Sequence, residues 1–91
     1  MNTNMDFSTA LKRLKAGYKV SRENWNDMYL LLVRGEAVTK SVHNRYGNPS
    51  LQDKSEIIPV SDTIYMKTAD NMLEAWKASQ SDLLADDWQV V

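Results

Sequence analysis

Hydrophobic residues recur at helical spacing near the start of the chain. The apolar positions that follow one another every three or four residues are Phe7, Ala10, Leu11 and Leu14. Asp6 stands just before them as a good N-cap, and Gly17 stands where a helix should end. This pattern predicts a helix over residues 7–16.

Beyond this helix the pattern changes to the short apolar and alternating runs that are typical of strands. Residues 18–22 alternate in part between apolar and polar, and residues 29–33 form a compact apolar run. The residues between these two runs favour a turn, which leaves Trp25 at a strand end or loop tip. Further strands are expected at residues 57–60, 64–68, 72–76 and 89–91, with a hairpin turn at 69–71.

Residues 39–55 contain few apolar positions, so we expect a variable loop or insertion there. The order of one helix, several strands, a short helix and a last strand predicts an α+β fold. Its sheet should be mostly antiparallel, with an N-terminal helix and a short C-terminal helix. We expect residues 1–91 to form a single ligand-binding domain.

The segment from Trp76 to Trp88 places two indole rings around a helix start. Ser79 or Ser81 can cap the first turn, and Asp82 adds the negative charge that is favoured there. Leu83 and Leu84 would then begin an apolar face. A helix start beside an aromatic ring can hold a phosphate while the ring stacks on a base.

Composition and charge limit the classes of partner. Eleven basic and twelve acidic residues give a net charge of −1, so the chain lacks the basic stripe that duplex nucleic acid or an anionic membrane would select. Absence of cysteine, of a signal peptide and of an apolar span predicts a cytoplasmic protein that does not span a membrane, and the near-neutral charge predicts no DNA, RNA or membrane partner. With 91 residues and no disulfide, self-association is a common source of stability.

The sequence gives little support to catalysis. His43 is the single histidine, so a Ser-His-Asp triad would have to recruit it from the polar middle of the chain. One histidine without cysteine is a poor match to zinc, and three glycines form no phosphate-binding loop pattern. We therefore expect no enzyme activity, no metal and no cofactor.

Four segments together resemble the phage Thoeris anti-defence two family. These are residues 7–17, 20–26, 66–70 and 76–88, which occur in the family's order with compatible spacing. The resemblance implies a non-enzymatic sponge that sequesters cyclic ADP-ribose isomers made by TIR-domain defence enzymes, and in some members cyclic dinucleotides. It also implies a homotetramer with ligand pockets between subunits. Where the family usually has a glycine-containing spacer, Asp27-Met28 follows Asn26 directly, which predicts a shorter and stiffer loop.

The residues themselves also form a coherent set for a nucleotide. Trp25 and Trp76 offer faces for bases, and Met28 offers an adaptable apolar contact. Arg22 can clamp phosphate and Lys67 can supply a point charge. Ribose hydroxyls and base edges are expected to hydrogen-bond to Asn26, Ser79, Gln80 and Asp82. Ser79 is also expected to hold phosphate.

Each of these features also has a structural interpretation. Trp76 and Trp88 are of a type usually found in cores, and Trp25 suits either a core or a binding site. Residues 79–82 can simply cap a helix, and Arg22 and Lys67 can lie on a solvated sheet face. Asp86 and Asp87, without an obvious basic partner in the sequence, are interpreted as solvated. Two rival functions thus stay open, a hydrolase of the same ligand and an interaction module with tryptophans in a subunit interface.

Overall fold

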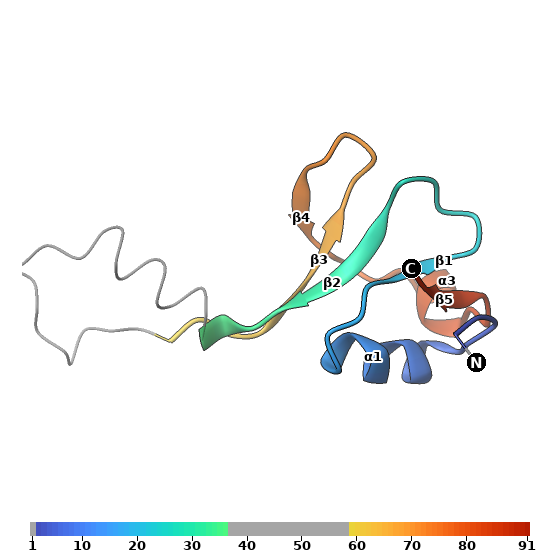
Figure 1. The fold of residues 1–91 in the computed structure, drawn as a ribbon, viewed down its shortest axis with the longest axis horizontal. Coiled ribbons are helices and arrows are strands. Elements are labelled where there is room, and N and C mark those ends of the chain that lie inside the picture. The colour runs from blue at the N-terminus through green and yellow to red at the C-terminus, as the bar shows by residue number, and fades with distance from the viewer. Residues whose placement is uncertain (1, 37–58) are drawn as a thin grey trace, which may run out of the picture. The chain divides into compact units, whose positions relative to one another are not determined.

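The computed structural model describes residues 2–36 and 59–91 of the chain (Figure 1). The chain divides into two compact units, one made of residues 1–32 and 64–91 and the other of residues 33–63. The loop predicted at 39–55 and the first half of the strand predicted at 57–60 lie outside the described residues. Pro59 and Val60, the second half of that strand, are described and are not in a strand.

Helix α1 (Phe7–Lys15) begins at the predicted residue and ends one residue before the predicted end. The Asp6 side chain accepts a hydrogen bond of 2.8 Å from the Thr9 amide, and this bond is the main cause that lowers the pKa of Asp6 below its ordinary value of 3.8. The stabilisation that the ionised cap supplies is complete above that ordinary value and is lost as the pH falls through the lowered pKa of the folded state. At the other end, Gly17 adopts a φ of +97°, and the amides of Gly17 and Tyr18 bond back to the helix in a Schellman motif.

The five strands form one sheet in the order β4-β3-β2-β1-β5. In chain order they are β1 (Val20–Arg22), β2 (Tyr29–Val33), β3 (Thr63–Lys67), β4 (Leu73–Ala75) and β5 (Trp88–Val90). The pairings of β1 with β2, of β1 with β5 and of β3 with β4 are all antiparallel. The predicted α+β fold with a mostly antiparallel sheet is confirmed.

Two tight turns in the sheet use residues in the left-handed region. Asn71 has a φ of +64° in the hairpin between β3 and β4, where the Thr68 amide donates to the Met72 carbonyl. Asp27 has a φ of +55° in the loop between β1 and β2. Asn and Asp tolerate this conformation better than other non-glycine residues. Asp27 therefore makes the turn between β1 and β2 without a glycine.

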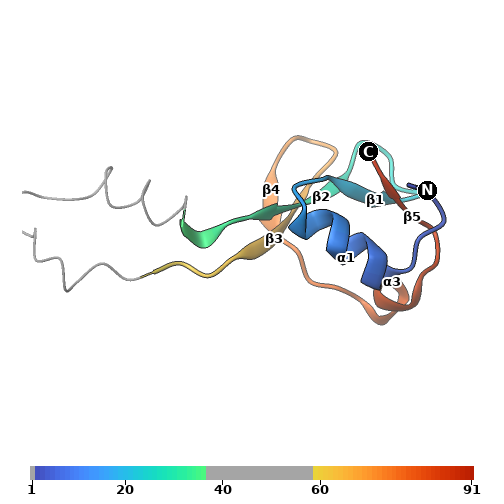
Figure 2. The same ribbon diagram turned by 60° about the horizontal axis from the view of Figure 1, so that its bottom comes forward.

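The core lies between α1 and one face of the sheet. Helix α1 packs against β1 and β5, as the two ribbon views show (Figures 1 and 2). The buried hydrophobic residues are Met5, Ala10, Leu14, Val20, Leu30 and Trp88. Trp88 has no exposed surface, so the core interpretation of this tryptophan is confirmed.

The short helix α3 (Gln80–Leu84) starts at the predicted cap, Ser79. Leu83 and Leu84, which should begin an apolar face, are exposed within the single chain, and Leu84 keeps 78% of its surface exposed. A helix of five residues ends before it can bury a full face, and Trp88 fills the core instead. None of the helices in residues 2–36 and 59–91 is long and apolar enough to span a membrane.

In the described part of the second unit, the Asp62 side chain contacts the residues that follow β2. Asp62 accepts a hydrogen bond of 2.8 Å from the Gly35 amide and an ion pair of 3.1 Å from Arg34. The pKa of Asp62 is lowered, first by the Gly35 amide and then by Arg34. These contacts join the chain that leaves β2 to the chain that enters β3.

Candidate functional site

A pocket of about 310 Å³ opens on the face of the sheet that α1 does not cover. Strands β1, β2, β3 and β5 supply its floor, and the loop between β1 and β2 supplies its wall. The residues that line it are Ser21, Trp25, Asp27, Met28, Tyr29, Lys67, Gln89 and Val91.

Strand alternation explains which residues reach this pocket. Successive side chains of a strand point to opposite faces of the sheet. Val20 and Leu30 are paired and belong to the buried core, so Ser21 and Tyr29 beside them face the other way. Ser21 pairs with Gln89 in the neighbouring strand, and the Gln89 amide donates to the Ser21 hydroxyl at 3.4 Å.

The loop between β1 and β2 is fixed at both ends by hydrogen bonds. The Trp25 amide donates to the Arg22 carbonyl at 3.1 Å, and the Lys67 ammonium donates to the Asp27 carbonyl at 2.9 Å. Trp25 is half-buried, and its ring meets the buried Trp88 ring edge-on at 5.3 Å between centroids. Trp25 therefore borders the pocket while its ring contacts the core.

Two lysine side chains make cation–π contacts with the Tyr29 ring. The Lys19 ammonium lies 4.8 Å and the Lys67 ammonium 5.5 Å from the ring centroid, both within cation–π distance. Lys67 lines the pocket, and Lys19 directly precedes β1. One edge of the pocket is consequently positive, although the whole chain has a net charge of −1.

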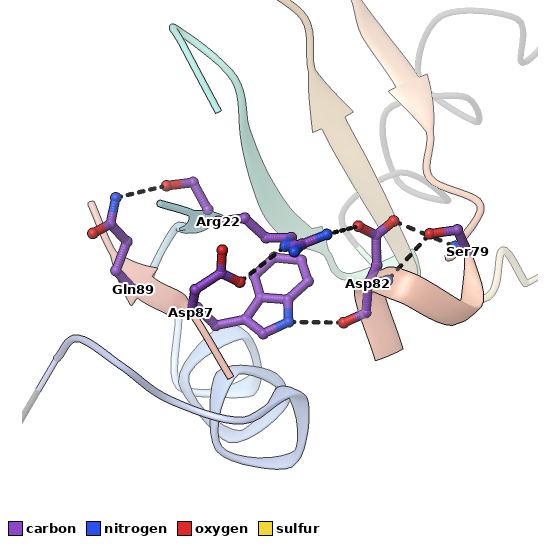
Figure 3. Close-up of polar contacts among 7 residues, drawn as sticks. Arg22, Ser79, Asp82, Asp87 and Gln89 are labelled. Atoms are coloured by element: carbon purple, nitrogen blue, oxygen red, sulfur yellow. Dashed lines mark hydrogen bonds and ion pairs between the residues drawn. The ribbon is translucent and has the colours of Figure 1, made fainter. Parts of the chain in front are cut away.

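Arg22 lies on the opposite face of β1 and is engaged by two carboxylates (Figure 3). Its Nη1 donates to Asp82 Oδ1 at 3.0 Å, and its Nε donates to Asp87 Oδ1 at 2.9 Å. The pKa of the guanidinium is raised, first by the Asp87 hydrogen bond and then by that of Asp82. The prediction that Asp87 has no basic partner is therefore wrong, because the fold brings Arg22 to it from 65 residues away.

Asp82 also takes part in the capping of α3. Its amide donates to the Ser79 hydroxyl at 3.1 Å, and its Oδ2 accepts from the Ser79 amide at 3.3 Å, which completes a capping box. The Trp88 indole N–H donates to the Asp82 carbonyl at 2.9 Å. Arg22, Ser79 and Asp82 thus join the short helix to the core (Figure 3).

The nine predicted site residues fall into separate groups. Trp25, Met28 and Lys67 are brought together in the pocket. Trp76 is half-buried and packs against Phe7 and Trp88, with ring centroids 5.6 and 6.0 Å apart. Of the remaining five, Arg22, Ser79 and Asp82 form ion pairs or cap α3. The other two, Asn26 and Gln80, are exposed and do not line the pocket.

Five pocket residues were not among those predicted from the sequence. They are Ser21, Asp27, Tyr29, Gln89 and Val91. Tyr29 was assigned to a buried run, and the pairing of β1 with β5 was needed to bring Ser21 and Gln89 together. Strict alternation outward from Val20 was the one signal that could have identified Ser21 as a residue of the open face.

Metal binding and histidine chemistry gain no support in this part of the chain. The described ranges contain no group of three or more histidine, cysteine, aspartate or glutamate residues that could hold a metal ion. His43 lies outside the described residues.

Fold and pocket together define a small α+β protein with a lysine- and tryptophan-bordered pocket on an open sheet face. Residues 5–91 match the model of the Tad2-like family, the Thoeris anti-defense 2-like domain, and the chain belongs to this family. The chain is also similar to a protein of Bacillus phage SP01 named Thoeris anti-defense 2. The two are 38% identical over 94 residues, which cover 100% of this chain and 99% of the relative. The family resemblance inferred from the sequence is confirmed, and it implies a phage anti-defence role.

Proposed function

We propose that this protein sequesters a cyclic nucleotide-type immune signal without converting it, and so blocks host anti-phage defence. The ligands proposed are cyclic ADP-ribose isomers, with cyclic dinucleotides as a second class, bound in the cytoplasm of the infected bacterium. Membership in a family named for Thoeris anti-defence supports this role. The observation that carries the proposal is the pocket in which Trp25 and Lys67 stand side by side with polar strand residues.

The pocket offers a group for each part of a nucleotide. The Trp25 face can stack on a base, a contact worth about 1–3 kcal/mol in proteins that bind single strands. The Lys67 ammonium can meet a phosphate, and Ser21 and Gln89 can hydrogen-bond hydroxyls. Its volume of about 310 Å³ lies at the lower end of the range for small-molecule sites. A second subunit that adds a wall would enlarge it.

Sequestration is proposed in preference to hydrolysis because of the groups that face the pocket. Among residues 2–36 and 59–91, the lining holds one carboxylate, from Asp27, and no histidine or cysteine. General acid–base hydrolysis commonly uses two titratable groups with separated pKa values. Binding needs only shape, stacking and charge, which this lining supplies.

We also propose that the protein is a homotetramer. Four apolar side chains, Met72, Leu73, Leu83 and Leu84, are more than 45% exposed in the single chain. Burial of such side chains against another subunit would be favourable, and small domains often gain stability in this way. Light scattering at micromolar concentration should give a mass about four times the 10.4 kDa of one chain. A monomer would contradict the tetramer and any pocket wall supplied by a second subunit.

Trp25→Ala should weaken the binding of a cyclic ADP-ribose isomer by about 1–3 kcal/mol, the value of one stacked base. Calorimetric titration measures the affinity, and thermal melting measures the stability of the same variant. Trp25→Phe is the matched control, because it keeps an aromatic face at the pocket and should retain most of the affinity. An affinity that is unchanged in Trp25→Ala would remove Trp25 from the binding site.

The interaction-module alternative makes a different prediction for the same variants. If the tryptophans served only a subunit interface, Trp25→Ala would change the mass measured by light scattering while no cyclic nucleotide bound the wild type. Joint measurement of mass and affinity therefore separates the two functions.

A further inference from the structure

The two lysines on the Tyr29 ring are arranged as a pair. Both ammonium nitrogens lie within 5.5 Å of one ring centroid, so they are separated by less than twice that distance. Lys67 is fixed further by its hydrogen bond to the Asp27 carbonyl. Tyr29, in the central strand β2, is thus the positioning residue for two cations that come from different parts of the chain.

Neither lysine has a carboxylate partner within ion-pair distance among residues 2–36 and 59–91, where the ion pairs formed involve Arg22 and Arg34. The Lys67 contacts are a carbonyl oxygen and a ring face, which leave ammonium donors for a ligand. The charge of Lys67 acts on Asp70 electrostatically, beyond ion-pair distance. The lowered pKa of Asp70 is due mainly to the hydrogen bond from Thr68, with Lys67 a smaller cause.

We infer that Lys19, Lys67 and Tyr29 form a clamp for two linked phosphates at the edge of the pocket. This inference rests on the proposed function, because it names the part of the ligand that this edge takes. Two ammonium groups at such a separation can each contact one phosphate of a pyrophosphate, and the pair of negative charges offsets the repulsion between the two lysines. Trp25, on the loop that walls the same pocket, would then take a base.

A residue of opposite charge, Asp27, stands in the same lining as Lys67. In the part of the chain that the structure describes, Asp27 is the one acidic residue that lines the pocket, and its carboxylate would oppose a phosphate. Its φ of +55° explains why Asp is present, since the turn requires a residue that tolerates the left-handed region. Asn tolerates the same conformation, so Asp27→Asn removes the charge and keeps the turn.

Inorganic pyrophosphate and a cyclic ADP-ribose isomer are the two probes for calorimetric titration of the whole chain. Lys19→Gln and Lys67→Gln should each weaken pyrophosphate binding about tenfold, the effect of one charge-assisted hydrogen bond. Tyr29→Leu should weaken pyrophosphate binding by a similar factor. Tyr29→Phe should bind pyrophosphate as the wild type does, since Phe keeps the ring that both lysines contact. Asp27→Asn should tighten it. All affinities should fall with added salt, because charges on this open face are screened.

Lys77→Gln is the matched control. It makes the same change in net charge at an exposed lysine that does not line the pocket, and it should leave pyrophosphate binding unchanged. Melting temperatures of all variants show whether any loss of binding is due to unfolding.

The outcomes separate this inference from the proposed function. Pyrophosphate binding that is absent in the wild type, or equal in the wild type and the double variant Lys19→Gln/Lys67→Gln, would overturn the clamp. If the cyclic ADP-ribose isomer still bound in that case, sequestration would stand without the clamp. Pyrophosphate binding that depends on both lysines, without binding of any cyclic nucleotide, would support the clamp and contradict the proposed ligand.

Discussion

Trp88→Ala is expected to lower the free energy of unfolding by about 3–5 kcal/mol, the range for removal of a large aromatic side chain from a core. Trp88 is fully buried and lies at the centre of the aromatic cluster formed with Phe7, Trp25 and Trp76. Its removal leaves a cavity beneath α1 and takes away the ring that Trp25 contacts. Chemical denaturation followed by circular dichroism measures the loss.

Trp88→Phe is the control for this substitution. It keeps an aromatic ring but removes the indole N–H that donates to the Asp82 carbonyl. We expect a smaller loss, of about 1–3 kcal/mol, from the unpaired carbonyl and the smaller ring. If the free energy of unfolding of Trp88→Ala equalled that of the wild type, Trp88 would not be the centre of the core.

Arg22→Ala is expected to destabilise the fold by roughly 2–3 kcal/mol, between the values for exposed and for buried ion pairs. The Arg22 side chain is 21% exposed, and the side chains of Asp82 and Asp87 are 15% and 29% exposed, so both carboxylates lose a partner where water reaches them only in part. Because Arg22 and the pocket residue Ser21 face opposite sides of β1, affinity for a cyclic ADP-ribose isomer should fall much less than stability.

Arg22→Lys keeps the charge but has a single ammonium group in place of the two donors that now reach Asp82 and Asp87. It should recover only part of the stability. A large loss of affinity in Arg22→Ala, with stability unchanged, would instead assign Arg22 to phosphate, as the sequence alone predicts.

Local signals in the sequence predicted most of the fold. The cap at Asp6, the Gly17 turn, the apolar run of β2 and the hairpin before β4 each depend on neighbouring residues, and each is present. The cap at Ser79 is also local and was predicted. The fate of Leu83 and Leu84 was not, because the burial of a helix face depends on what packs against it.

The candidate site could be predicted only in part, because it depends on pairing between distant segments. Residues 21 and 22 are adjacent, yet one lines the pocket and the other joins an ion-pair cluster on the opposite face. Only the pairing of β1 with β5 brings Ser21 to Gln89 and Arg22 to Asp87. Residue type identified Trp25, Met28 and Lys67, but it could not separate them from Arg22, Ser79 and Asp82.

The central claim is that the pocket holds a cyclic nucleotide signal and releases it unchanged. The most direct test is to saturate the protein with a cyclic ADP-ribose isomer, remove unbound ligand, denature the complex by heat and identify the released molecule by mass spectrometry. Sequestration predicts intact isomer in amounts proportional to protein, and a marked decrease with Trp25→Ala. Release of a hydrolysed product, or of no nucleotide, would contradict the account.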